Sequence, residues 1–380
     1  MQLLQNLANS GPLLRQAVSG GNLKVLRSML GPAFRGLIQQ RGKHEDATSL
    51  RLDYRARFDW RYARGERQLA RLYEAAKASQ WNATTDLDWT VSVDPRCGAR
   101  PILPDAFLPM AALPAFQRLG PADKGVQRHA VLSWLLSQFL HGEQGALFAA
   151  CQVTEAVPWL DAKLYGSTQV VDEGRHVEVF HTYLTRKLEK LYDINDNLYV
   201  VIDALMSDGR WDLKFLGMQI MIEGLALGAF GFMRAATSEP LLKQLLTAVI
   251  TDEARHVHYG VLALQKFYAT EISEKERRER EEWALEVALL LRSRFLAHEL
   301  YEEHWAHQLS RKSWDKLVLE SETMAAFRRT MFRRIVPNLK RIGLLGPRVR
   351  PRYAQAGLLE FEHGRAAPEL TAEDLLADRA

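Results

Sequence analysis

Two five-residue stretches, DEGRH at residues 172–176 and DEARH at residues 252–256, decide how this chain folds. Both lie in long windows rich in Ala, Leu, Glu, Arg and Gln, a composition that predicts helices. In a helix, a Glu and the His three residues later project from the same face. Each stretch therefore offers a carboxylate and an imidazole that can bind one metal ion together.

A single glutamate stands 30 residues before each pair: Glu143 before Glu173, and Glu223 before Glu253. Adding 80 to positions 143, 173 and 176 gives 223, 253 and 256, so the chain repeats one helical hairpin. Packed as a four-helix bundle, two such hairpins bring four Glu and two His into one interior. The predicted metal ligands, which are also the predicted catalytic residues, are Glu143, Glu173, His176, Glu223, Glu253 and His256.

The neighbours of these glutamates favour an inward position. Glu143 lies within LSQFLHGEQGALFAA and Glu223 within LGMQIMIEGLALGAFGF. Burying a lone carboxylate is costly, and four crowded carboxylates repel one another and take up protons. Two divalent cations supply the four positive charges that balance them. The alternative, two ordinary solvated helix faces, leaves the repeated spacing unexplained.

The aspartates that open the two stretches have a predicted task. A metal-bound His usually gives its second N–H to a carboxylate. We expect each aspartate to hold the histidine of the opposite stretch, Asp172 with His256 and Asp252 with His176. The arginines can pair with these aspartates and balance their charge. The predicted outer residues are Asp172, Asp252, Arg175 and Arg255.

The pattern Glu143, DEGRH, Glu223, DEARH resembles that of the ferritin-like non-haem di-iron carboxylate oxygenases. It is similar to the hydroxylase subunits of bacterial multicomponent monooxygenases, to arylamine N-oxygenases and to CoA-ester epoxidases, over residues 122–270. The resemblance implies two iron ions that activate O2 as a co-substrate, with manganese as an alternative in one site. It implies that Glu173 and Glu253 bridge the ions, that Glu143 and Glu223 are more terminal, and that His176 and His256 each bind one ion.

Three positions depart from these families. The arylamine N-oxygenases carry an extra metal-binding His where this chain has Val249. The multicomponent hydroxylases usually place a Thr where this chain has Leu227. Phe180 occupies the place of the radical Tyr in the small subunit of ribonucleotide reductase. These departures weigh against that N-oxygenase subclass, against the proton delivery of the hydroxylases and against a stable tyrosyl radical at that place.

We predict an all-α fold, a ferritin-like four-helix bundle with additional N- and C-terminal helices. The predicted domains are an N-terminal helical extension and wrapping loop (1–121), the di-iron bundle (122–310), and a C-terminal helix, basic segment and acidic tail (311–380). Ser238 is the predicted cap of the fourth bundle helix, and Trp89–Val93 is the best short strand candidate. The predicted long helices are 61–82, 122–156, 159–191, 210–236, 239–270, 273–310 and 313–335.

The predicted function is that of an O2-activating monooxygenase, by hydroxylation or N-oxygenation of a small organic or carrier-bound substrate. The chain has no flavin, NAD or iron–sulfur motif, so an external electron donor, a ferredoxin or a reductase, is expected. Two alternatives stay open: a metal-dependent oxidase (Fe/Fe or Mn/Fe) without oxygen insertion, and a non-catalytic iron-handling protein. Substrate, metal and donor identity are not readable from the sequence, and a homodimer is the default assembly.

The composition of the chain limits its expected partners and location. The chain has 380 residues, of which 47% are hydrophobic and 25% charged, and its net charge of +4 argues against general nucleic-acid binding. Two cysteines, Cys97 and Cys151, make no disulfide framework, so a cytoplasmic location is expected. The apolar run Leu225–Met233 is far shorter than the roughly 20 residues that span a bilayer, so no membrane is expected. The N-terminus does not have the pattern of a signal peptide.

Weaker signals remain open. HELYEEH at residues 298–304 lacks the metalloprotease spacing and is interpreted as a charged helix face. Nine Lys or Arg lie between Arg328 and Arg352, either on a solvated helix or on a dock for an acidic redox or carrier protein. The glycines at 224, 228 and 231 leave room for a ligand, permit bending or allow close helix packing. Apolar pocket candidates one turn from the ligands are Phe139, Leu147, Val177, Phe180, Ile220, Leu227 and Val249.

Overall fold

Every regular element of the described residues is a helix. The computed structural model of the chain describes residues 5–6, 9–10, 22–44, 47–50, 52, 55–96 and 101–377, and no strand occurs among them. The prediction of an all-α fold is therefore confirmed. Cys97 lies outside the described residues, and Cys151 is a free thiol.

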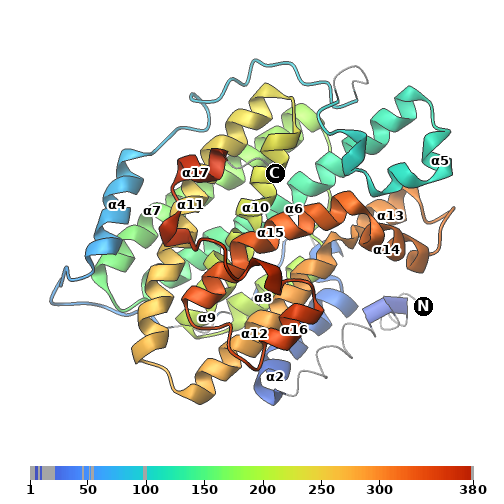
Figure 1. Cartoon of the computed structure of the whole chain (residues 1–380). Coiled ribbons are helices and arrows are strands. Elements are labelled where there is room, and N and C mark those ends of the chain that lie inside the picture. The colour runs from blue at the N-terminus through green and yellow to red at the C-terminus, as the bar shows by residue number, and fades with distance from the viewer. Residues whose placement is uncertain are drawn as a thin grey trace.

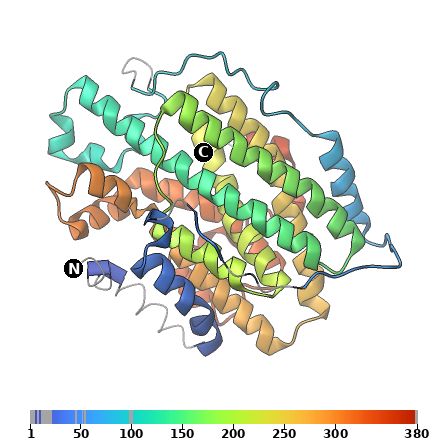
Figure 2. The same ribbon diagram turned by 180° about the vertical axis from the view of Figure 1, so that it is seen from behind.

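Two helical hairpins form the centre of the fold. The first consists of α6 (Pro121–Ala156) and α7 (Leu160–Tyr183), the second of α10 (Glu223–Ala236) and α11 (Pro240–Thr270). α6 packs along α7, α10 packs on α11, and α7 contacts α11 (Figures 1 and 2). Pro121 and Pro240 stand in the first turn of their helices, where the missing N–H has no helical partner to lose. The buried interior between the hairpins receives the six predicted ligands.

The first helix of the second hairpin is not a regular α-helix throughout. α9 (Trp211–Phe215) continues into the π-helical segment η5 (Leu216–Ile222), which leads directly into α10 at Glu223. π-helical turns are rare and often mark functional sites. The whole stretch Trp211–Ala236 is long and apolar enough to span a membrane, but 89% of its most apolar window is buried inside the protein.

The remaining elements cover these hairpins. α4 (Arg67–Ala78) packs on α7 and α11, and α15 (Glu322–Arg341) packs on α10 (Figure 1). α2 (Leu23–Ala33) and α12 (Glu274–Ser293) pack on α8 (Asp196–Ser207). The other elements are η1 (Phe34–Ile38), α3 (Arg41–His44), η2 (Asp105–Phe107), η3 (Pro109–Ala112), α5 (Pro114–Gln117), η4 (Leu184–Leu188), η6 (Arg294–Leu296), α13 (His298–His304), α14 (Arg311–Glu320), α16 (Arg350–Gln355), η7 (Leu359–Phe361), η8 (Ala367–Glu369) and α17 (Ala372–Ala377).

The sequence did not predict α8. Its side chains are buried on nearly every side, so DNLYVVIDALMS shows no clear polar face. Asn195 caps the helix, since its side-chain oxygen accepts a hydrogen bond from the backbone N–H of Asn197 at 3.0 Å. A helix packed on all sides lacks the periodic pattern from which surface helices are recognised.

Two local predictions were wrong. Trp89–Val93 forms turns and bends, because Lys187 Nζ donates to the carbonyl oxygens of Trp89 and Val91, at 2.8 Å each. The cap of α11 is Glu239 and not Ser238: its carboxylate accepts from the backbone N–H groups of Leu241 and Leu242. A carboxylate fills the same role as a hydroxyl at this position and also suits the helix dipole.

The helix predicted over 273–310 is interrupted. Ala297 adopts a left-handed conformation with φ of 49°, which separates α12 and η6 from α13. Trp314 Nε1 donates to the carbonyl oxygen of Leu296 at 2.6 Å and thereby fixes the break. The predicted helix 313–335 is likewise two helices, α14 and α15. The predicted helix 61–82 is shorter, since only Arg67–Ala78 is helical.

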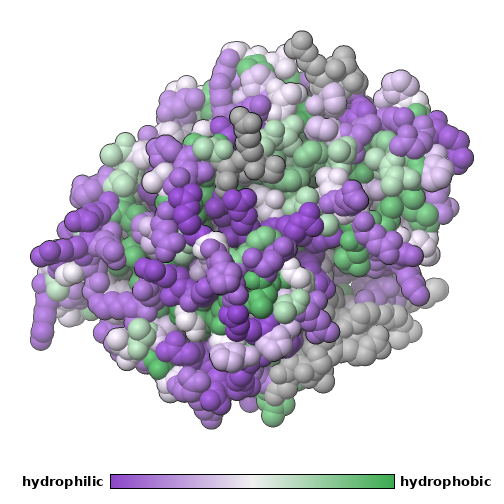
Figure 3. All heavy atoms as spheres, viewed as in Figure 1, coloured by the Kyte–Doolittle hydropathy of each residue, from purple (hydrophilic) through white to green (hydrophobic). Residues whose placement is uncertain are grey.

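The charges of α12 and of the basic segment neutralise each other in part. Arg348 pairs with Glu282 and Arg352 with Glu286, so the C-terminal segment covers the acidic side of α12. Several charged residues of α12 are therefore buried, among them Glu282 and Glu286. Hydrophilic side chains dominate the face of the molecule drawn in Figure 3, with hydrophobic residues between them.

Gly228→Ala is expected to destabilise the protein by about 1–3 kcal/mol. A Cβ atom at Gly228 would lie 2.7 Å from Cα of Met331 and 2.7 Å from the carbonyl oxygen of Thr330, and backbone atoms cannot move aside. Gly231→Ala is the matched control on the same helix, because no atom lies within 4 Å of its Cβ position. The control is expected to be neutral or slightly stabilising. Urea unfolding of both variants measures the difference, and equal stabilities would contradict the close packing of α10 on α15.

Candidate metal centre

The structure brings the six predicted ligands together from four helical segments. Glu143 comes from α6, Glu173 and His176 from α7, Glu223 from the start of α10, and Glu253 and His256 from α11. All six side chains are buried. They form two groups whose ligand atoms lie within 4.8 Å of one another. The first is Glu143, Glu173, His176 and Glu253, and the second is Glu173, Glu223 and His256.

Each histidine presents Nδ1 to the carboxylates. Nδ1 of His176 lies 3.3 Å from Glu143 Oε2 and 3.2 Å from Glu253 Oε1. Nδ1 of His256 lies 3.1 Å from Glu173 Oε1. Glu253 Oε1 is also 3.5 Å from Nδ1 of His256, so this carboxylate lies between the two rings, as a bridging ligand requires.

The opposite ring nitrogens meet the predicted aspartates. Nε2 of His176 lies 3.2 Å from Asp252 Oδ2, and Nε2 of His256 lies 3.2 Å from Asp172 Oδ2. Both predicted cross-hairpin pairs are therefore present. An Nε2–H that donates to a carboxylate leaves the lone pair on Nδ1, on the side of the glutamates.

The arginines tie the two aspartates together. Nη2 of Arg175 contacts Asp172 and lies 2.9 Å from Asp252 Oδ2. Nη2 of Arg255 contacts Asp252 and lies 3.6 Å from Asp172 Oδ2. Both aspartates are fully buried, and two guanidinium groups balance their two charges.

Several buried ligand atoms of the cluster have no hydrogen-bond partner. The buried atoms without a hydrogen-bond partner include Glu173 Oε2, Glu223 Oε2, both carboxylate oxygens of Glu253, and Nδ1 of His256. Buried polar atoms are nearly always paired, so five such atoms at one place require an explanation. Carboxylate oxygens and imidazole nitrogens without a partner are a fitting donor set for two divalent first-row metal ions. The residues present therefore fit a pair of divalent metal ions.

The pKa shifts of the cluster also favour bound cations. Burial raises the pKa of the Glu143 carboxyl to about 8, although the hydrogen bond from His176 opposes the change. Burial and the charges of Glu173 and Glu253 hold the pKa of Glu223 well above its usual value. Burial disfavours charged imidazoles, but the surrounding carboxylates raise the pKa of His176 and His256. Without cations, protons carry the positive charge here, and bound metal ions would replace them.

Three residues around the cluster were not predicted. Trp81 Nε1 donates to Asp252 Oδ2 at 2.7 Å, and Gln80 Nε2 donates to Asp172 Oδ1 at 3.1 Å. Gln169 Nε2 donates to Glu173 and to Glu223, at 3.0 Å each. Gln169 is one helical turn before Glu173, so its spacing was a usable signal. Gln80 and Trp81 follow α4, about 90 residues before the first motif, and no sequence spacing links them to it.

A small cavity adjoins the carboxylates. Its volume is about 10 Å³, the room of one water molecule. Phe139, one of the predicted pocket residues, lines it, and so do three of the four glutamates. The described lining residues are Gln138, Phe139, Gly142, Glu143, Ala146, Ile222, Glu223, Ala226, Glu253 and Arg294.

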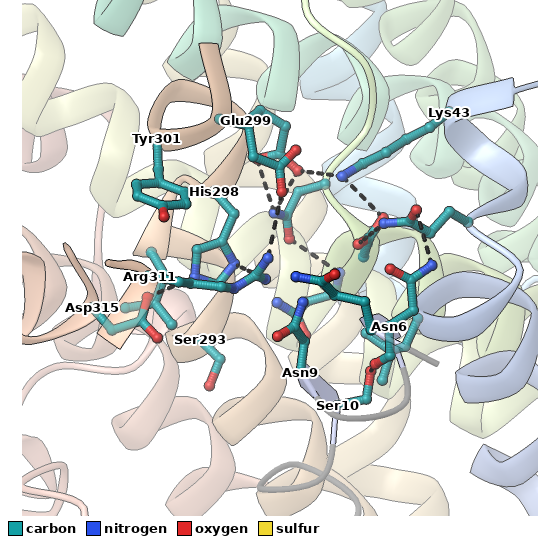
Figure 4. A pocket seen from close by; sticks show the side chains of 18 of the residues that line it. Asn6, Asn9, Ser10, Lys43, Ser293, His298, Glu299, Tyr301, Arg311 and Asp315 are labelled. Carbon is teal, nitrogen blue, oxygen red and sulfur yellow. Dashed lines mark hydrogen bonds and ion pairs between the residues drawn. The ribbon is translucent and has the colours of Figure 1, made fainter. Parts of the chain in front are cut away.

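A second cavity of about 870 Å³ is polar and separate (Figure 4). Figure 4 shows Glu299 facing Lys43, whose Nζ lies 3.0 Å from Glu299 Oε1, while Arg311 lies against His298. The segment 298–304 is helical and carries charged residues, and within it the side chain of Glu299 is only 8% exposed. None of the described residues that line this cavity lines the carboxylate cavity.

Comparison with known proteins adds no name to this site. No family model and no curated protein matches the chain. The function must therefore be inferred from the residues and their geometry.

Proposed function

We propose that this protein is an O2-activating oxidoreductase with a non-haem di-iron centre, held in a ferritin-like bundle formed by α6, α7, α10 and α11. The observation that carries the proposal is the set of unpaired buried ligand atoms at the meeting point of two repeated hairpins. A cluster of four carboxylates and two imidazoles at this depth is unfavourable without cations. Its Glu-x-x-His pairs are the donors of di-iron carboxylate bundles.

The groups of converging atoms suggest how the ions are held. Glu143, His176 and Glu253 would hold one ion, and Glu223 and His256 the other, with Glu173 shared between them. Glu253 lies near both histidines and would be the second bridge. Two ferrous ions bound there would supply electrons for the reduction and activation of O2.

The residues of the chain then have defined tasks. Asp172 and Asp252 hold the tautomer and the orientation of the histidines through Nε2–H. Arg175 and Arg255 pair with these aspartates and supply the opposite charge. Buried apolar side chains, such as Phe139 and Ile222 in the cavity wall, exclude water from the reacting groups.

The reaction class that we propose is monooxygenation, either hydroxylation or N-oxygenation, of a small organic or carrier-bound substrate. Insertion of one oxygen atom with reduction of the other to water consumes two electrons beyond those of the substrate. Because the chain carries no flavin or nicotinamide motif, a separate ferredoxin or reductase would deliver them.

Anaerobic loading with Fe(II) is expected to give two iron ions per chain. One O2 should then be consumed for each pair of irons, and Mössbauer spectra should show a coupled di-iron site. Isotopically labelled O2 in a single turnover with candidate substrates tests oxygen insertion. The control is His176→Ala, in which iron binding and O2 consumption should both fall sharply.

Other outcomes would favour other functions. A turnover that oxidises a substrate without incorporating the label would favour an oxidase. Uptake of many iron ions per chain would favour iron storage. A wild-type chain that binds no metal would overturn the proposal.

A further inference from the structure

Arg294 is a buried cation without a counterion. It is the first residue of η6, at the break between α12 and α13, and its residue surface is only 3% exposed. Its Nε atom has no hydrogen-bond partner, and no ion pair of this side chain occurs among the described residues. Burial lowers the pKa of Arg294 to about 10, so the guanidinium remains charged at neutral pH.

Arg294 shares a cavity with the candidate metal centre. The small cavity is lined by Glu143, Glu223 and Glu253 and also by Arg294. The other lining residues are mainly apolar and include Phe139, Ala146, Ile222 and Ala226. The cavity therefore has the metal-facing carboxylates, an apolar wall and a single guanidinium.

The charges of the metal-loaded centre balance without Arg294. Four glutamates carry four negative charges, which two divalent ions neutralise. Asp172 and Asp252 carry two more, which Arg175 and Arg255 neutralise. The positive charge of Arg294 then has no partner in a fully loaded centre. An isolated buried charge is strongly unfavourable, and such groups are normally paired.

The glutamates of the cluster do not supply the missing partner. No ion pair joins Arg294 to any of these glutamates among the described residues, whereas Glu143 and Glu253 both lie close to Nδ1 of His176. Each of these glutamates also faces ligand atoms of its own group within 4.8 Å. Among the residues that the structure describes, only a movement of the cluster could supply a counterion to Arg294, whereas a bound anion could supply it without such a movement.

We propose that Arg294 binds the carboxylate group of an organic monoanion whose apolar part lies against the cavity wall, beside the metal centre. The inference rests on the proposed function and names its substrate class. A carboxylate matches the planar guanidinium in shape and supplies the one missing negative charge. A monoanion held at Arg294 would place its apolar part toward the carboxylates, where the reaction occurs.

The cavity must widen to admit such a molecule, because it now holds about one water. Part of its wall has no side chain: Gly142 is buried, and no atom lies within 4 Å of its Cβ position. Gly142 itself lines the cavity, so this open space adjoins it. Acetate requires the least widening among carboxylates with an apolar part, and benzoate requires more.

The test uses the full chain loaded with Fe(II) under nitrogen, with acetate and benzoate as probes and their neutral analogues acetamide and benzamide as controls. Calorimetric titration and the shift of the melting temperature measure binding, so no turnover is required. We expect at least one of the two anions to bind and to stabilise the protein, and the amides to do neither. Arg294→Met should weaken anion binding about 10- to 100-fold, as loss of a hydrogen-bonded charge implies. Arg294→Lys should weaken it less.

Arg294→Met should still bind two iron ions, because Arg294 is not a ligand, and it should melt at a higher temperature than the wild type without anions. Equal anion affinity in Arg294→Met and wild type would mean that the anions bind the metal alone and would overturn the inference. Absence of any anion binding to the iron-loaded wild type would also overturn it, while leaving the proposed function in place. A wild type that binds no iron would overturn both.

Discussion

Glu173→Ala is expected to abolish tight binding of both metal ions, because Glu173 belongs to both groups of converging ligand atoms. We expect the affinity for each ion to fall by at least about 100-fold, since loss of an outer partner alone costs about 10- to 100-fold. At a free metal concentration 1,000 times the Kd, each bound ion stabilises a folded chain by about 4 kcal/mol. The variant should lose this stabilisation. Metal analysis and calorimetric melting with and without Fe(II) measure both effects.

Two further variants test whether Glu173 is shared by both ions. Glu143→Ala removes a ligand of the first group only, so one ion should remain. Gln144→Ala changes the exposed neighbour on the same helix and should bind both ions like the wild type. Without metal, Glu173→Ala should also be less stable than the wild type, because it removes the carboxylate that faces Nδ1 of both histidines and the amide of Gln169. Full metal content in Glu173→Ala would contradict the assignment of the centre.

Arg175→Ala is expected to destabilise the protein by about 3–5 kcal/mol, the usual effect of breaking a buried ion pair on one side. Arg175 contacts Asp172 and Asp252, which are both fully buried, and its guanidinium also lies 4.7 Å from the ring centre of Trp81. Without it, two aspartates share the single charge of Arg255. Chemical unfolding at neutral pH measures the change.

Two further variants distinguish the effect of the lost charge on stability from the effect of the lost packing. Arg175→Met keeps most of the side-chain volume and should lose nearly as much stability as Arg175→Ala. The combined variant Arg175→Met with Asp172→Asn removes the excess negative charge and should regain part of the loss. If the two aspartates carried no charge, the combined variant would regain nothing.

Local periodicity allowed much of the candidate centre to be predicted. Two residues three positions apart in a helix share a face, because three residues make nearly one turn. Glu173 and His176 are such a pair. The shift of 80 residues between the two motifs then implied a repeated hairpin, and the exchange of aspartates between hairpins followed from it. Both aspartate–histidine pairs occur in the structure.

Residues whose role depends on distant elements escaped prediction. Trp81 reaches Asp252 from a segment 171 positions away, and no spacing rule covers such a contact. α8 was not predicted, because a helix buried on all sides shows no periodic polar face. Ser238 looked like the better cap by residue type, yet Glu239 takes that place because its carboxylate also accepts from Tyr183.

The sequence by itself determined which side chains can act as ligands and that the described fold is helical, because both depend on interactions within a few residues. The tertiary structure alone decided which charges are compensated. Arg294 closely follows the apolar run VALLL (287–291), and it is buried near the break at Ala297, where α14 packs on η6. It lines the small cavity together with three of the glutamates. Burial and pairing are properties of all neighbours at once, and most neighbours of Arg294 come from remote parts of the chain.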